Sequence, residues 1–371
     1  MHKLLLLQAL RAVAAGLVVF SHALQTYSGK ILHTDLTQLE WGAGFGVQVF
    51  FIISGFIIYR TTIDQPPGLH STARFLSRRI VRIAPVYWLA TAIYALKLIA
   101  QSNPPSWLAF TESLFFIPFR NPAENDMMRP VLGVGWSLNY EMFFYVVLAA
   151  ALLLPKQARF AAVTTLMLAF MLLGQTHVAG AEAGLWLLAT HWLGYFLLGM
   201  FIAMAESRLH AHLPALRGTV VLSSVAAIVV TYLLTRNLLT MTDAQGHLVS
   251  GTLGTLAVML CVTARPSRST NPLSRQIQRW LVNAGDGSYS TYLFHSFVLG
   301  PAARILAKLH ITPPPLLFAA LMVIVCTIVG YIVFRLFESR MTLMLNRRID
   351  RLLPKGAPHG GETDHKVAAP R

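Results

Sequence analysis

The sequence predicts an all-α fold, a polytopic membrane helical bundle with about ten transmembrane helices. Of its 371 residues, 55% are hydrophobic and only 12% are charged, which is about half the charged fraction of a soluble domain. Apolar windows long enough to cross a bilayer recur along the chain. Its Lys and Arg residues also follow the asymmetry that orients membrane proteins.

The apolar windows place the helices in order. Each is about as long as the hydrocarbon core requires, and the fifth is the shortest. The windows lie near residues 5–26, 43–60, 83–101, 134–154, 160–174, 184–204, 218–235, 248–264, 288–307 and 316–337.

The distribution of basic residues predicts that both termini are cytoplasmic. If the chain starts inside, ten spans return its end to the same side. Of the 30 Lys and Arg residues, 23 then lie on the inner side and 7 on the outer side, as the positive-inside rule requires. This distribution accounts for the net charge of +15, so no nucleic-acid partner is expected.

Three segments outside the windows have their own character. The outer stretch 102–133 contains "SWLAFTESLFFIPF", which is too short to span and predicts a surface or re-entrant helix. Residues 340–354 predict a basic surface helix on the inner side, and the polar residues 355–371 predict disorder. We therefore expect a membrane domain over 1–338 and a cytoplasmic surface helix and tail over 339–371.

The first helix, "RAVAAGLVVFSH", carries an arginine and a histidine on one face. Arg11 and His22 are eleven residues apart, which is about three turns and roughly 16 Å of helix. Arg11 near the inner surface could snorkel to the interface, and His22 could be a polar helix end. Two ionisable groups on one stripe instead favour a site inside the bundle.

Glu141 is the only acid in the middle of any window. A carboxylate in hydrocarbon has to be paired, protonated or hydrated. It either balances an arginine structurally or takes part in chemistry. By the predicted topology it lies at a depth similar to that of His22, so we expect that the two can meet.

Two further groups of polar residues are candidates. Arg78, Arg79 and Arg82 precede the third window; they either orient the helix or hold phosphate oxygens through paired hydrogen bonds. Tyr292 and His295 share a helix face with Ser288 in the ninth window, and the same topology places His295 in the inner half of the membrane.

Those ninth-window residues bind a ligand or make structural hydrogen bonds, and we interpret His191 as structural. The two cysteines have no metal-ligand spacing, so no metal is expected. The sequence has no Walker loop, dinucleotide fingerprint, zinc-protease motif or nucleophile elbow.

Five blocks, in this order, resemble the bacterial acyltransferase 3 family of integral-membrane O-acyltransferases. They are "LLQALRAVAAGLVVFSHA", "FGVQVFFIISGFIIY", "FLSRRIVRIAPVYW", "GVGWSLNYEMFFY" and "SYSTYLFHSF". The likeness covers about residues 6–338 and is greatest to the exopolysaccharide acetyltransferase, ExoZ-like branch. Many members carry aspartate at the positions of Gln8 and Gln48, so no acidic role is carried over there.

The resemblance implies an acetyl-CoA-dependent O-acyltransferase in the bacterial inner membrane. Such enzymes move an acyl group from cytoplasmic acyl-CoA to a hydroxyl of a cell-envelope glycan, either lipid-linked or polymeric. His22 matches the essential histidine of the family and Glu141 its motif glutamate, so both are predicted as catalytic. Arg11, Arg79 and Arg82 match its motif arginines and are predicted to bind the donor.

Tyr292 and His295, in the fifth block, are predicted to bind the donor as well. Membrane lipid is an expected partner, and a homo-oligomer is compatible with the sequence. The alternative function is a transporter or flippase of a lipid-linked glycan, which is also polytopic with buried charges. Against it, the chain shows no paired broken helices and no series of membrane acids. A non-catalytic anchoring subunit would tolerate replacement of His22.

Overall fold

The structure is a computed structural model that describes residues 3–32, 41–122, 126–174, 184–212, 218–238, 242–264 and 272–354. Across these ranges it is helical, and the one β feature is an isolated bridge between Asn121 and Met127. The prediction of disorder for residues 355–371 lies outside the described ranges.

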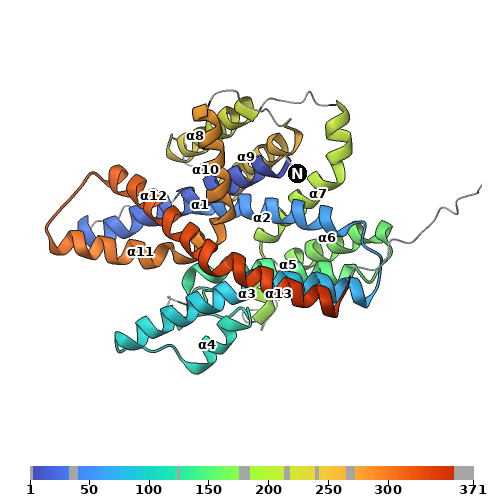
Figure 1. The fold of residues 1–371 in the computed structure, drawn as a ribbon, viewed down its shortest axis with the longest axis horizontal. Coiled ribbons are helices and arrows are strands. Elements are labelled where there is room, and N and C mark those ends of the chain that lie inside the picture. Colours follow the sequence, from blue (N-terminus) through green and yellow to red (C-terminus); the bar gives the residue numbers. More distant parts are fainter. Residues whose placement is uncertain are drawn as a thin grey trace, which may run out of the picture.

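The helices follow one another in a single series (Figure 1). The α-helices are α1 (Lys3–Tyr27), α2 (Trp41–Thr62), α3 (Leu69–Ala100), α4 (Trp107–Leu114), α5 (Trp136–Ala151), α6 (Lys156–Leu173), α7 (Trp192–His212), α8 (Gly218–Leu238), α9 (Asp243–Thr263), α10 (Pro272–Asp286), α11 (Ser288–Lys308), α12 (Pro315–Val333) and α13 (Ser339–Leu352). Short turns lie over Ser28–Leu32, Gly133–Gly135, Gly184–Leu188 and Phe334–Glu338.

A long helix occupies each of the ten predicted windows, but two boundaries were wrong. Helix α3 begins at Leu69 rather than near 83, because the polar stretch before the window is amphipathic and buries Phe75. Helix α7 begins at Trp192 rather than at 184, after a 3₁₀ turn and the bend at Thr190, whose hydroxyl lies 3.1 Å from that of Tyr140.

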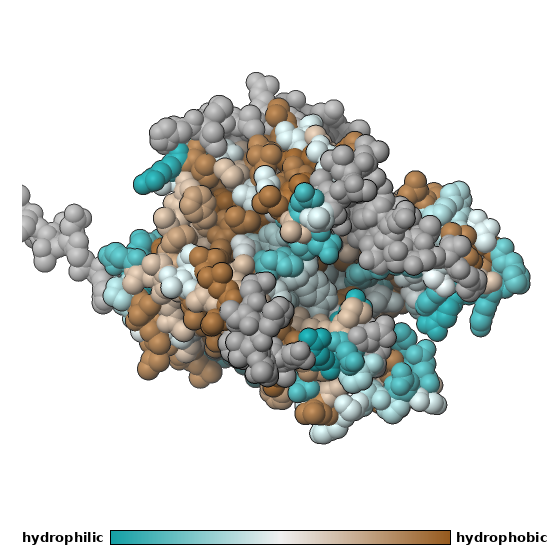
Figure 2. All heavy atoms as spheres, turned by 180° about the vertical axis from the view of Figure 1, so that it is seen from behind, coloured by the Kyte–Doolittle hydropathy of each residue, from teal (hydrophilic) through white to brown (hydrophobic). Residues whose placement is uncertain are grey.

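Six of the described helical segments are long and apolar enough to cross a membrane. They are Leu5–Leu32, Gly42–Thr62, Leu69–Ala100, Lys156–Leu173, Asp243–Thr263 and Pro315–Leu352. Large apolar side chains of α12, including Leu316, Leu321 and Ile328, remain about half exposed, and brown apolar areas cover much of the surface in Figure 2. The protein is therefore a multi-pass membrane protein, since such surfaces require a hydrocarbon solvent.

Helix α1 lies in the interior and packs against α2, α9, α10, α11 and α12. Small residues permit the close approach: a side chain at Gly46 of α2 would begin 2.5 Å from the carbonyl oxygen of Ala14, and one at Gly285 of α10 would begin 2.0 Å from that of Gln8. Any larger residue there would push the helices apart. Helix α10 lies outside the ten predicted windows.

A small core joins the C-terminal halves of α1 and α11 to α12. Val19, Ala23 and Tyr27 of α1 pack there with Leu299 and Ala303 of α11, and Phe318 and Cys326 of α12 complete the cluster. The cluster fixes the C-terminal halves of α1 and α11 side by side (Figure 1).

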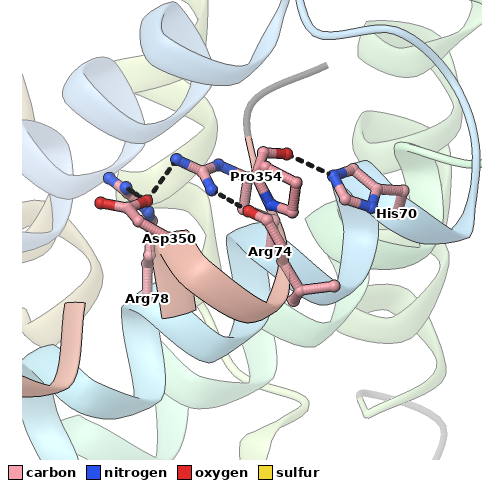
Figure 3. Close-up of polar contacts among 6 residues, drawn as sticks. His70, Arg74, Arg78, Asp350 and Pro354 are labelled. Atoms are coloured by element: carbon pink, nitrogen blue, oxygen red, sulfur yellow. Dashed lines mark hydrogen bonds and ion pairs between the residues drawn. The ribbon is translucent and has the colours of Figure 1, made fainter. Parts of the chain in front are cut away.

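Helix α13 is held along the first half of α3, as Figure 3 shows. Asp350 accepts hydrogen bonds from Arg74, at 2.6 Å, and from Arg78. Arg74 also donates to the carbonyl of Leu353, and His70 Nε2 lies 2.7 Å from that of Pro354. These contacts satisfy carbonyl groups at the end of α13 that lack helical partners.

The predicted helix over 340–354 is therefore present as α13, and a helix of eight residues, α4, forms within 102–133. Between α12 and α13 the chain makes a π-helical turn over Phe334–Glu338. The predicted domain boundary at residue 338 falls at the end of this turn, and the division stays a prediction.

Candidate active site

His22 of α1 and His295 of α11 form a hydrogen-bonded pair. The distance from His22 Nδ1 to His295 Nε2 is 2.8 Å. The ring planes differ by 10° and the centroids are 5.0 Å apart, so the rings meet edge to edge in nearly one plane. His295 is 1% exposed and His22 is partly buried.

The remaining contact of His295 determines the tautomers of the neutral pair. His295 Nδ1 lies 2.6 Å from the carbonyl oxygen of Tyr292. A carbonyl only accepts, so Nδ1 carries the proton and Nε2 of His295 is an acceptor. His22 must then donate from Nδ1, which leaves its Nε2 with a free lone pair. The arrangement prepares His22 as a base or nucleophile.

The structure contradicts the expected depth of His295. Because it bonds His22, it lies at the same level of the bundle as His22 rather than in the inner half. The expectation that Glu141 meets His22 is also wrong. Glu141 Oε1 instead accepts from Ser54 at 2.9 Å and from Tyr145 at 2.5 Å.

A cavity of about 150 Å³ lies between α1, α2, α3, α5 and α11. Its polar lining comprises Arg11, Ser54, Arg79, Arg82, Ser137, Glu141, Tyr145, Tyr289 and Tyr292, and the rest is aliphatic or phenylalanine side chains. Pockets for organic ligands combine an apolar wall with a few such convergent polar groups.

Tyr292 contacts both the cavity and the histidine pair. Its hydroxyl donates to the carbonyl oxygen of Val134 at 2.6 Å and lies 2.9 Å from Ser137 Oγ. The same residue lines the cavity and supplies the carbonyl that orients His295.

At the other end of the cavity, Arg82 is paired with Glu338. The distance from Arg82 Nη1 to Glu338 Oε1 is 2.7 Å, and Glu338 Oε2 accepts from Ser290 Oγ at 2.6 Å. Glu338 is 0% exposed. A carboxylate is stable at such a place because both its oxygens have partners.

Arg11 belongs to the same charged cluster. Its Nη1 donates to Gln8 at 3.0 Å, and it interacts electrostatically with Arg82, Glu338, Glu141 and Asp286. Burial raises the pKa of the Asp286 carboxyl at the end of α10, while Arg11 and Arg82 oppose that shift. The cluster therefore combines arginines with carboxylates that offset their charge.

Arg79 differs from its neighbours. Its guanidinium lies over the rings of Phe75 and Tyr145, 5.5 and 6.0 Å from their centroids. Among the described residues no carboxylate pairs with it, and its Nε is buried without a hydrogen-bond partner. Arg79 is thus a cation in the cavity wall that can receive an anionic ligand.

The structure brings the predicted residues into two groups rather than one. Arg11, Arg79, Arg82, Glu141 and Tyr292 line the cavity, whereas His22 and His295 form a pair outside its lining. The predicted position of Arg79 and Arg82 before the third helix was wrong, because both lie within α3.

Sequence reasoning missed three residues of these groups. Glu338 was the lone acid at the end of the last apolar window, a signal that could have found it. Arg129, just before the "GVGWSLNYEMFFY" block, interacts electrostatically with His22 and Tyr292. Ser137 carried no signal, because only the fold brings it to Tyr292.

His191, interpreted as structural, lies apart from both groups. Its ring is 4.0 Å from that of His247, centroid to centroid, and 5.3 Å from that of Trp192. His247 Nδ1 is in turn 3.5 Å from the amide of Gln48. None of these residues lines the cavity, and the structural role of His191 stays a prediction.

The fold and the candidate site define a multi-pass membrane protein whose interior holds a polar cavity and a histidine pair. Residues 5–335 match the family model of an acyltransferase domain, and the chain therefore belongs to the acyltransferase 3 family. It is 32% identical over 301 residues to the exopolysaccharide production protein ExoZ of Rhizobium meliloti (strain 1021), covering 79% of this chain and 87% of that protein. No solved structure matches the chain.

Proposed function

We propose that the protein transfers an acetyl group from cytoplasmic acetyl-CoA to a hydroxyl of an exopolysaccharide, with His22 as the reacting base or acyl relay. The observation that carries the proposal is the hydrogen-bond series from Tyr292 through His295 to His22, which leaves one lone pair on His22. The similarity to ExoZ supports the acceptor class.

The cavity suits the donor. Acetyl-CoA carries several phosphate charges, and Arg11, Arg79 and Arg82 meet at one end of the cavity. The pantetheine arm spans roughly 15–20 Å when extended, and Arg11 and His22 are about 16 Å apart along one helix. The phosphates at the arginines would therefore place the thioester near His22.

The proposed topology has ten spans, with both termini in the cytoplasm and the bundle in the bacterial inner membrane. The arginine end of the cavity then faces the side where acetyl-CoA is made, and His22 lies toward the opposite side. The excess of Lys and Arg in the inner segments supports this orientation. The acceptor would approach from outside.

In the proposed reaction, His22 acts on the sugar hydroxyl and the thioester. His22 Nε2 removes the proton of the sugar hydroxyl, whose oxygen attacks the thioester carbonyl carbon. The C–S bond breaks, and the leaving thiolate takes the proton from the imidazolium. In the relay route Nε2 itself attacks the thioester carbonyl carbon, the C–S bond breaks and the coenzyme A thiolate leaves. The sugar hydroxyl oxygen then attacks the acetyl carbon, the N–C bond to His22 breaks, and the hydroxyl proton passes to the thiolate. Arg129 is placed to stabilise charge near His22.

Glu141 takes a supporting role. Because it contacts Ser54 and Tyr145 in the cavity wall and interacts with Arg11, it would hold the arginine end in place rather than exchange protons with the sugar. His295 and Tyr292 orient His22. The earlier interpretation of His295 as a donor-binding residue is replaced by this positioning role.

Transfer of radiolabel tests the proposal. The purified full chain, radiolabelled acetyl-CoA and exopolysaccharide repeat units are combined, and label in the glycan is counted. We expect His22→Ala to lower the rate by about 10²- to 10⁴-fold, the range for a lost general base. His310, an exposed histidine beyond α11, supplies the control: His310→Ala should retain full activity.

Equal labelling by wild type and His22→Ala would contradict the catalytic role of His22. Movement of unmodified lipid-linked glycan across the membrane of proteoliposomes, without label transfer, would instead show the transport function. A thermal unfolding midpoint for His22→Ala that matches that of the wild type excludes misfolding as the cause of a lost activity.

A further inference from the structure

Three basic side chains converge at the ends of α1, α3 and α11 that lie beyond the histidine pair. Lys30 is in the π turn after α1, Lys97 in the last turn of α3, and Arg304 in the last turns of α11. Lys30 Nζ and Arg304 Nη2 are 3.6 and 3.9 Å from the point where a side chain on Gly300 would begin. Lys97 interacts electrostatically with both other cations.

The three charges have little compensation within the part of the chain that the structure describes. No carboxylate there forms an ion pair with any of them. Lys97 Nζ lies 4.6 Å from the ring centroid of Tyr94, and Arg304 Nε donates to the Gly300 carbonyl at 3.3 Å. These neutral contacts leave three like charges in mutual repulsion, which a bound anion would relieve.

The position of the triad relates it to the proposed reaction. Lys30 is eight residues beyond His22 on α1, and Arg304 is nine residues beyond His295 on α11. At the rise of a helix these separations are about 12–14 Å. The packing of Ala23, Tyr27 and Leu299 holds the two helices together between the two sites. A group bound at the triad is therefore at a fixed distance from the reacting imidazole, about two or three sugar units away.

We propose that Lys30, Lys97 and Arg304 form a subsite for an oxyanion carried by the acceptor glycan, either a phosphate or a carboxylate, which sets which hydroxyl reaches His22. This inference rests on the proposed acyltransferase function and deepens it. Lys and Arg bind both kinds of oxyanion through charge-assisted hydrogen bonds. On the proposed topology the triad faces the acceptor side, opposite the arginines that would hold the donor.

The acceptor's Michaelis constant tests the subsite. Three acceptors share one repeat unit: one uncharged, one with a carboxylate substituent and one linked to a polyprenyl diphosphate. The variant combines Lys30→Gln, Lys97→Gln and Arg304→Gln, and Lys308→Gln, an exposed cation on the same helix, is the matched control. The protein is held in phosphatidylcholine nanodiscs, so that no anionic lipid competes.

For the triple variant we expect a KM at least about tenfold higher for the acceptor whose anion the triad binds. Its KM for the uncharged acceptor, its KM for acetyl-CoA and its kcat should stay within about twofold of the wild type. The anionic acceptor whose KM rises in the triple variant identifies the ligand of the triad as the carboxylate or the diphosphate. An unchanged KM for both anionic acceptors, or an equal rise for the uncharged one, would overturn the subsite.

A binding measurement separates this inference from the proposed function. Inorganic pyrophosphate is titrated calorimetrically into the same nanodiscs with saturating coenzyme A. Wild type and Lys308→Gln should bind one more pyrophosphate than the triple variant does. If neither the wild type nor either variant transfers acetyl, but the difference in bound pyrophosphate persists, the acyltransferase proposal fails and the anion subsite stands. If transfer is normal and the difference is absent, the subsite fails alone.

Discussion

The two groups of candidate site residues are built differently: the arginines and carboxylates at the cavity form the arginine end, and His22 with His295 forms the histidine end. At the arginine end, Arg11, Arg82, Glu141 and Glu338 balance one another, and each carboxylate there has two partners. At the histidine end, two neutral rings and a backbone carbonyl form one directed series of hydrogen bonds. The first arrangement binds charge, whereas the second directs a lone pair. This difference predicts that variants at the two ends affect different kinetic constants.

After the substitution of His22, we expect the largest effect at the histidine end from the substitution of its partner, His295. His295→Ala removes the acceptor for His22 Nδ1, so His22 no longer favours the tautomer with a free Nε2. We expect kcat to fall about 10²-fold, the lower range for losing a positioned proton-transfer group, while KM for acetyl-CoA stays unchanged because His295 does not line the cavity.

Two results would show that His295 orients His22 rather than merely filling space. His295→Gln keeps an acceptor and should recover a good part of kcat, and both variants should unfold at the same temperature. A rise in KM for acetyl-CoA with unchanged kcat would instead assign His295 to donor binding. Steady-state kinetics with varied acetyl-CoA supplies both constants.

The arginine end should show the opposite pattern, with a smaller effect. Arg79→Ala removes a cation that no described carboxylate neutralises, so we expect about a tenfold higher KM for acetyl-CoA and a kcat within about twofold of the wild type, since one charge-assisted hydrogen bond is worth about 1.5–3 kcal/mol. Arg78→Ala is the matched control. The adjacent Arg78 pairs with Asp350 and does not line the cavity.

Glu338→Gln tests whether the balance of charge at the arginine end affects the binding of acetyl-CoA. It removes the charge that holds Arg82 but retains the shape of the side chain and one acceptor for Ser290. We expect weaker binding of acetyl-CoA than in the wild type and no loss of His22 reactivity. Unchanged donor affinity in both Arg79→Ala and Glu338→Gln would refute the phosphate role of this end.

The sequence predicted the helices and the faces of single helices well, but it did not predict which helices contact one another. Apolar windows placed all ten long helices, because hydrophobicity is a property of each segment alone. The face shared by Arg11 and His22 followed from helical periodicity in the same way. Which helix faces His22 depends on how helices pack, and the windows do not encode that. His295 was therefore assigned to the wrong depth, and Glu141 to the wrong partner.

The start of α3 and the position of Glu338 were missed for a related reason. The stretch before residue 83 is polar on one side only, so a hydropathy window ends where the helix does not. Glu338 is placed by the π turn between α12 and α13, a local change in helical pitch that directs its carboxylate to Arg82. Such turns depend on tertiary contacts, and are frequent at functional sites.

The smallest expected effect lies farthest from both ends, in the contact of α13 with α3 (Figure 3). Asp350→Ala removes the acceptor of Arg74 and Arg78, but the Asp350 side chain is 48% exposed, and water screens exposed ion pairs so that they contribute little to stability. We expect a small loss of thermal stability and acetyl transfer within about twofold of the wild type. Because α13 follows directly on the turn that carries Glu338, a KM for acetyl-CoA raised as far as in Glu338→Gln would contradict this expectation. It would show instead that the surface contact positions Arg82, and that the arginine end extends to the surface of the protein.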